Sequence, residues 1–202
     1  MSCFPITKEA IDHLKSVDEK LGRAIDSIGT IHAEIVPDLF QSIVFSIVSQ
    51  MISAKAASTI SSRFVERFVP FTPETLALQS VESIQQCGIS MRKAKNISEF
   101  SKKVVDGIFD LIQIRNMTDA EVIAQLSSLK GVGRWTAEMI LIFTLERPDV
   151  VAWDDLALRR GMCQLYGLET ISKEEFLGYA ARYSPYGSTA SLFLWEYSHI
   201  EK

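Results

Sequence analysis

Two short stretches of the chain carry residue types and spacings that could do chemistry. In "DVVAWDDLALRR" two adjacent carboxylates, Asp154 and Asp155, open a helical pattern directly after Trp153. A carboxylate held ionised there can stabilise a developing cation. The alternative is structural: one aspartate caps the helix and the other interacts favourably with the helix dipole. For the aspartate pair taken alone, capping is the simpler interpretation.

The second stretch, "LKGVGRWTAEMI", places Gly131 and Gly133 between two apolar helical patterns. A glycine inside a helix costs about 1 kcal/mol relative to alanine, so the pair predicts a turn. We expect one helix to end at Leu129 and the next to run from Arg134 to about Glu146. Such a turn lets the backbone approach another molecule closely, and the N-terminus of the second helix favours an anion such as phosphate. A tight turn with a left-handed glycine remains the alternative.

Helical patterns occupy almost the whole chain. Apolar residues recur at spacings of three and four, as in residues 40–48 and 122–129. Only residues 149–153 are predicted to be extended, and they are too short and solitary to build a sheet. Predicted caps and stops are the capping boxes of Thr118 with Glu121 and Ser172 with Glu175, the N-caps Ser53, Thr72 (before Pro73) and Ser90, and the stops Gly88 and Gly167. We predict an all-α fold of about ten helices with no significant sheet, in one domain over residues 1–202.

Composition and cysteine usage exclude several classes of protein. The 202 residues are 47% hydrophobic and 23% charged, enough for a sizeable core and unlike a disordered chain. No apolar run approaches the roughly 20 residues of a membrane span, and the first residues do not resemble a signal peptide, so we expect an intracellular soluble protein. The three cysteines and three histidines are scattered without a C-x-x-C pair, which supports neither a disulfide framework nor a side-chain metal site.

The distribution of charge matters more than its total. A formal net charge of −4 argues against a nucleic-acid partner when the chain is taken as a whole. However, "MRKAKNISEFSKK" gathers five basic residues, which are Arg92, Lys93, Lys95, Lys102 and Lys103. For this run alone, a solvated helix face is the simpler interpretation.

Five ordered blocks resemble the helix–hairpin–helix DNA glycosylases, and within them the 3-methyladenine DNA glycosylase II branch. The blocks are "FQSIVFSIVSQMISAKAASTI", "CGISMRKAKNI", "LKGVGRWTAEMI", "DVVAWDDLALRR" and "SPYGSTASLFLW". The resemblance covers about residues 40–195. It implies a two-lobed helical fold with a cleft between the lobes and the hairpin at about residues 126–137. The chain has no room for the N-terminal β-rich domain of the larger members.

The resemblance implies a backbone grip on DNA phosphate through N–H groups near Gly131 and Gly133. Such a grip needs few lysines, so an acidic protein could still bind duplex DNA, with Arg134 and the basic run as helpers. The implied DNA-binding residues are Gln50, Met51, Ser53, Gly131, Gly133, Arg134 and Thr136. The carbonyls of Ser127, Leu129 and Val132 could hold Na⁺ or K⁺. No cofactor is expected to be required, and the four-cysteine iron–sulfur loop of another branch is absent from the sequence.

Met51 is implied to be the apolar side chain that fills the hole left in the duplex when a damaged nucleotide is flipped out. Gln50 beside it could hydrogen-bond the base that has lost its partner. The alternative is that Met51 fills a gap in a helical core, which is a common use of methionine.

The family's catalytic aspartate matches Asp155, whose implied role is to stabilise the sugar cation and to orient or activate water. The implied base pocket is formed by Trp135, Trp195, Met139 and Tyr186, with Trp153 a weaker candidate. Each tryptophan could instead be packed in the core. Met139 stands where some relatives have a tyrosine and stacks less well, which puts the breadth of substrates in question.

The implied activity is release of alkylated purines, of the 3-methyladenine and 7-methylguanine type, from duplex DNA by base flipping, which starts base excision repair. Strand-cutting relatives place a lysine directly after "GVGR", where this chain has Trp135, so lyase activity should be absent. We expect a monomer, nucleoid-associated in the cytoplasm of a prokaryote or nuclear in a eukaryote. Two alternatives are a non-catalytic helix–hairpin–helix DNA-binding protein and a glycosylase for uncharged damaged bases.

Overall fold

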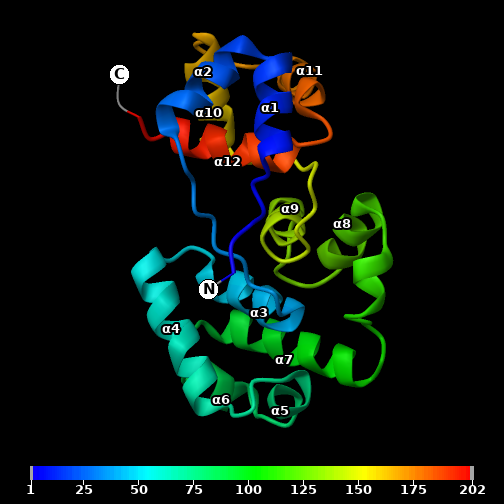
Figure 1. Ribbon diagram of the computed structural model, residues 1–202. Helices are drawn as coiled ribbons and strands as arrows, with labels where there is room; N and C mark the ends of the chain where they lie inside the picture. The colour runs from blue at the N-terminus through cyan, green and yellow to red at the C-terminus, as the bar shows by residue number, and fades with distance from the viewer. Residues whose placement is uncertain (1, 201–202) are drawn as a thin grey trace. The chain divides into compact units, whose positions relative to one another are not determined.

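The computed structural model describes residues 2–200, which form twelve α-helices and one 3₁₀ helix (Figure 1). Within these residues the β-type pairing is limited to an isolated antiparallel bridge between Cys3 and Glu34. The predicted all-α class is therefore confirmed, with two five-residue helices, α5 and α6, beyond the roughly ten expected. No helix in this part of the chain combines the length and apolar character that a membrane span requires.

The chain divides into two compact units. Unit 1 consists of Met1–Ile35 with Leu141–Lys202, and unit 2 of Val36–Ile140. In each unit one helix packs against several of the others. This helix is α12 in unit 1 and α7 in unit 2.

In unit 1, α12 (Gly187–Tyr197) packs against α1 (Lys8–Val17), α2 (Glu19–Ile28), α10 (Leu156–Tyr166) and α11 (Lys173–Tyr183). The first eight residues of α12 are small or apolar and all are buried. A Cβ on Gly161 of α10 would lie 2.1 Å from the carbonyl oxygen of Leu194, so glycine permits the close approach of these two helices. The core side chains include Leu14, Leu21, Ile25, Leu158, Met162, Leu165, Phe176, Phe193 and Leu194.

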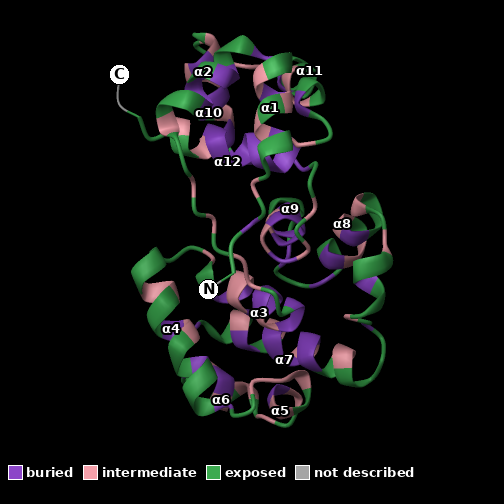
Figure 2. Ribbon diagram, viewed as in Figure 1, coloured by how far each residue is buried: buried purple, intermediate pink, exposed green. Residues whose placement is uncertain are grey.

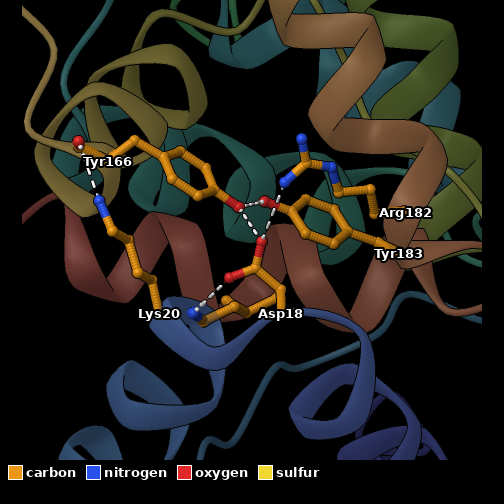
Figure 3. A network of polar contacts seen from close by, with 6 residues as sticks. Asp18, Lys20, Tyr166, Arg182 and Tyr183 are labelled. Atoms are coloured by element: carbon orange, nitrogen blue, oxygen red, sulfur yellow. Dashed lines mark hydrogen bonds and ion pairs between the residues drawn. The ribbon is translucent and has the colours of Figure 1, made fainter.

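Asp18 ties three helices of unit 1 together (Figure 3). Its Oδ1 caps α2 by accepting the Leu21 N–H at 2.9 Å, and its Oδ2 accepts the Tyr166 hydroxyl of α10 at 2.5 Å. The hydroxyls of Tyr166 and Tyr183 lie 2.7 Å apart, and the guanidinium of Arg182 is 3.8 Å from Oδ2. Burial raises the pKa of both tyrosine hydroxyls, so they stay protonated. These contacts compensate the buried carboxylate.

In unit 2, α7 (Met91–Val105) packs against α3 (Leu39–Ser49), α5 (Pro73–Ala77) and α6 (Val81–Gln85), and α3 also packs on α4 (Ala54–Arg67). Figure 2 shows buried residues along α3 and α7 and exposed residues along much of α4. The Phe40 and Phe100 rings stack with centroids 5.4 Å apart, which joins α3 to α7.

The remaining elements are η1 (Gln113–Asn116), α8 (Asp119–Ser127) and α9 (Arg134–Phe143). Two predicted helix ends are wrong. α8 stops two residues before Leu129, and α9 stops at Phe143 instead of running to about Glu146. The second difference arises because Glu146 adopts a positive φ of 53° and the Arg147 N–H donates to the Leu141 carbonyl at 2.8 Å.

The predicted caps are confirmed. Both capping boxes form, Ser53, Thr72 and Ser90 cap α4, α5 and α7 through their side chains, and Gly167 ends α10 in the left-handed conformation.

Candidate functional site

The turn between α8 and α9 holds both glycines of the predicted hairpin. The Val132 N–H donates to the Leu129 carbonyl at 3.0 Å, and Gly131 has a φ of +88°. A Cβ on Gly131 would lie only 2.7 Å from Nδ2 of Asn96 on α7. The positive φ therefore favours glycine at position 131, and a larger residue would also have to displace the Asn96 amide; the structural interpretation is correct for this residue.

Gly133 is different, because the described protein does not require it. Its φ is outside the left-handed region, and a Cβ there would meet no described protein atom within 4 Å. Its carbonyl accepts the Ala137 N–H at 3.0 Å, which places Gly133 at the N-cap of α9. The first N–H groups of a helix have no partner inside the helix, so a phosphate oxygen could approach them here without meeting a side chain.

Arg134 is the first residue of α9 and lies next to this open approach. Its Nε donates to Oε1 of the buried Glu138 at 2.9 Å, one helical turn further on. This ion pair orients the guanidinium while most of the Arg134 side chain stays exposed. Thr136, also predicted to bind DNA, is 8% exposed, so its side chain belongs to the packed interior.

Met51 occupies the turn between α3 and α4. Its side chain is 99% exposed, and its φ of 58° lies in a region that non-glycine residues seldom adopt. Ser53, two residues later, accepts the Ala56 N–H at 3.3 Å and caps α4. The predicted exposure of Met51 is confirmed and the core-filling alternative is wrong, whereas its role at DNA stays a prediction.

Direct hydrogen bonds connect the Met51 turn to the hairpin and to α7. Gln50 Nε2 donates to the Gly131 carbonyl at 2.5 Å, although the two residues are 81 apart in the sequence. Lys93 Nζ donates to the carbonyls of Val48 at 2.8 Å and of Gln50 at 2.5 Å. Burial, with a smaller effect of the Arg92 charge, lowers the pKa of the Lys93 ammonium. Unit 2 therefore brings Gln50, Met51 and Gly131 together.

The position of Lys93 corrects the sequence interpretation of the basic run. That interpretation made the run a solvated face or a set of phosphate contacts, yet the Lys93 ammonium is directed at protein carbonyls. Lys103 forms an ion pair with Glu99 on the same helix at 3.8 Å. Of this run, Arg92, Lys95 and Lys102 are exposed. Lys93 lies in the block "CGISMRKAKNI" that resembles the family, but nothing in the sequence showed which groups its ammonium would meet.

In unit 1, the structure distinguishes the two adjacent aspartates. Asp155 caps α10 by accepting the Leu158 N–H at 2.9 Å through Oδ1, and the residue is 7% exposed. Asp154 lies in the preceding turn and is exposed. The capping interpretation is therefore correct for Asp155. Capping and charge stabilisation are compatible, because capping fixes one carboxylate oxygen in place.

Trp135 is 46% exposed on the first turn of α9, in unit 2, so simple core packing does not describe it. Met139 follows one turn later on the same helix and is partly buried. An exposed indole and a partly buried thioether on one helix face present an apolar surface that a planar ring could contact.

Trp195 and Trp153 pack against the core of unit 1. Trp195 stacks on Phe143 with centroids 5.7 Å apart. Trp153 contacts Phe176 edge-on at 5.3 Å, and the Arg159 guanidinium lies 4.7 Å from its ring centroid. The packing interpretation is therefore correct for these two residues, and any role in binding a base would add to it.

Tyr186 lies in a hydrogen-bonded turn before α12. Asp149 accepts the Gly187 N–H at 3.0 Å and the Ser184 hydroxyl at 2.5 Å. His13 Nε2 lies 2.9 Å from the Ser184 carbonyl, and its ring meets Tyr186 edge-on at 5.2 Å. Both Asp149 and His13 were missed by sequence reasoning, since their partners are far away in the chain.

The monovalent cation at the hairpin carbonyls stays a prediction. Ser127, Leu129 and Val132 supply backbone oxygens, and the Leu129 oxygen, which accepts one N–H, retains a second lone pair. Within residues 2–200 no group of three or more histidine, cysteine or acidic side chains could hold a metal ion.

Comparisons with known proteins agree with this geometry. A family model described as "HhH-GPD superfamily base excision DNA repair protein" matches residues 44–182. DNA-3-methyladenine glycosylase 1 of Schizosaccharomyces pombe is 30% identical over 203 residues, covering 96% of this chain and 89% of the relative.

Two solved structures are also similar. A DNA-3-methyladenine glycosidase from Bacillus halodurans superposes with a TM-score of 0.86 at 34% identity, over 99% of this chain and 94% of the other. The S. pombe 3-methyladenine DNA glycosylase Mag1, solved in complex with abasic DNA, superposes with a TM-score of 0.81 at 28% identity, over 94% and 96% of the two chains. The chain belongs to the HhH-GPD superfamily of base excision DNA repair proteins.

Proposed function

We propose that this protein is a monofunctional DNA glycosylase of the 3-methyladenine II type, which hydrolyses the N-glycosidic bond of alkylated purines in duplex DNA. The main observation is that Gly133 has open space before the N-terminus of α9, while Met51 is fully exposed in the same unit. Neither feature serves the packing of the protein, and both suit a duplex with a flipped nucleotide. The names of its relatives support the substrate class.

The proposed chemistry uses one carboxylate for the sugar and several aromatic rings for the base. Purines alkylated at N3 or N7 carry a positive charge, so they leave as neutral bases and need little acid assistance. Asp155 stabilises the oxocarbenium-like sugar cation and orients the attacking water. Trp135, Tyr186 and Trp195 supply electron-rich faces for the cationic base, and Met139 supplies an apolar contact.

The absence of strand cleavage follows from Trp135. Lyase chemistry needs an amine that forms a Schiff base with the sugar, and an indole has none. The product should be an intact strand with an abasic site until alkali is added. A borohydride-trapped adduct between the purified protein and DNA would contradict this part of the proposal.

A monovalent cation bound by the carbonyls of Ser127, Leu129 and Val132 would stiffen the hairpin. At constant ionic strength, DNA affinity should then be higher in K⁺ or Na⁺ than in tetramethylammonium, which is too large for such a site. Equal affinity in all three salts would exclude a role for the cation. Sedimentation of the protein alone would test the expected monomer.

One experiment separates the proposal from its alternatives. The protein is incubated with duplex DNA treated with a methylating agent, and with duplexes carrying an oxidised or a mismatched base, and released bases are identified by chromatography. Release of 3-methyladenine and 7-methylguanine supports the proposal. Release of uncharged bases alone would identify a glycosylase of different specificity, and binding without any release would identify a non-catalytic DNA-binding protein.

A further inference from the structure

One polar face of α7 contacts both turns that the proposed function places at DNA. Lys93, Asn96 and Glu99 follow one another at spacings of three, so they lie along one side of the helix. Lys93 bonds the end of α3, and Asn96 packs against Gly131 of the hairpin. Glu99 forms an ion pair with Lys130 of the hairpin at 2.9 Å. All of these contacts lie within unit 2.

Lys93 bonds the carbonyls at the end of α3, directly before Met51. The last carbonyls of a helix have no partner inside the helix, and the ammonium of Lys93 bonds those of Val48 and Gln50 at the end of α3. The next residue, Met51, has a positive φ, which a non-glycine residue keeps only when its surroundings hold it there. Met51 itself is fully exposed and gains no packing that would fix it.

We propose that Lys93 is a positioning residue for duplex DNA, which holds the Met51 turn at a fixed place relative to the hairpin. This inference rests on the proposed function. It differs from a phosphate-contact role, because the Lys93 ammonium acts on protein carbonyls and affects DNA only through the position of the Met51 side chain. Gln50 completes the connection, since its carbonyl accepts from Lys93 and its amide donates to Gly131.

The test is a set of substitutions in two backgrounds. Lys93→Met removes the clamp but keeps a side chain of similar length, and Lys95→Met removes the same charge from an exposed position of the same helix. Each is made in the natural protein and in Met51→Ala, and single-turnover excision is measured on duplex and single-stranded methylated DNA. Urea melts check folding, and Lys93→Gln serves as a second variant if Lys93→Met folds poorly.

Lys93→Met should lower duplex excision by at most about 10-fold, the loss expected when the Met51 side chain is removed, because Lys93 acts through that side chain. Single-strand excision should fall much less. The effect of Lys93→Met should nearly vanish in the Met51→Ala background, because the side chain that Lys93 positions is gone. Lys95→Met should act alike on both substrates and in both backgrounds. Backbone order parameters of residues 50–53, measured by NMR relaxation, should fall in Lys93→Met and not in Lys95→Met.

The inference is overturned if Lys93→Met impairs both substrates equally, or if its full effect persists when Met51 is alanine, since either result would indicate a phosphate contact or a general loss of structure. Unchanged backbone order parameters at residues 50–53 would overturn it independently of activity. A natural protein that releases no base from methylated DNA would instead refute the proposed function. The two failures are therefore distinguishable.

Discussion

The candidate functional groups of the two units differ in how far they are exposed to solvent. In unit 2 they are exposed side chains and backbone groups in turns, with Met51 and the open space at Gly133 as the clearest cases. In unit 1 the central group is a buried carboxylate, Asp155, fixed by the Leu158 N–H. Groups that grip DNA must reach outward, whereas a charge that stabilises a transition state acts best when fixed in a water-poor site. Substitutions in unit 2 should therefore change affinity and duplex preference, and substitutions at Asp155 should change the rate.

Asp155→Asn should give the largest effect. Asparagine caps helices about as well as aspartate, so the variant removes the charge while keeping the cap of α10. The single-turnover excision rate should fall by on the order of 10²–10³-fold, while DNA affinity stays unchanged or rises as a negative charge is lost near phosphate. Rapid-quench kinetics with saturating enzyme measure the rate. If the rate falls only because the variant binds DNA more weakly, the proposal that Asp155 governs the rate and unit 2 governs affinity is wrong.

Met51→Ala should give the next largest effect and only on duplex DNA. The exposed side chain contributes little to packing, so the free energy of unfolding should change by less than about 0.5 kcal/mol. Duplex excision should fall by about 10-fold, corresponding to about 1.4 kcal/mol of the flipping cost. Single-strand excision should fall less. The matched control is Met162→Ala in the core of unit 1, where a loss of about 2–5 kcal/mol in stability is expected.

Alanine substitutions at the two hairpin glycines should differ in their effects on DNA affinity and on stability. Gly133→Ala should weaken DNA binding by about 10-fold, because the methyl group would stand where phosphate is proposed to approach. It should lower the free energy of unfolding by no more than about 1 kcal/mol, since alanine is a poorer N-cap than glycine. Gly131→Ala should lower stability as well, since its φ is positive and its Cβ would meet Asn96. Equal loss of stability in both variants would show that Gly133 also serves the fold.

Asp154→Asn should give the smallest effect. Asp154 is exposed in the turn, so its replacement should change the excision rate by less than about 3-fold and stability by less than about 0.5 kcal/mol. The same kinetic assay as for Asp155→Asn makes the comparison direct. If the Asp154 variant is as slow as the Asp155 variant, the assignment of the catalytic carboxylate is wrong.

Local sequence rules were reliable where the interacting groups are close in the chain. The capping boxes at Thr118 and Ser172 and the caps at Ser53 and Ser90 formed as predicted, because each needs only a side chain and an N–H three residues later. The helix ends at Leu129 and Glu146 were less accurate, since turn hydrogen bonds and a positive φ shortened both helices. No local rule indicated which lysine of the basic run would turn inward.

By itself, the sequence determined the all-α class, the caps, the glycine turn and the blocks that identify the superfamily, because these depend on periodicity and on neighbours within a few residues. The tertiary structure alone decided which glycine the fold requires, which aspartate is buried, and that Lys93 meets the end of α3. The physical reason is distance along the chain. Gln50 and Gly131 are 81 residues apart, and Lys93 is 45 from Val48, so only the packing of α7 against α3 and the hairpin brings their polar groups within bonding range.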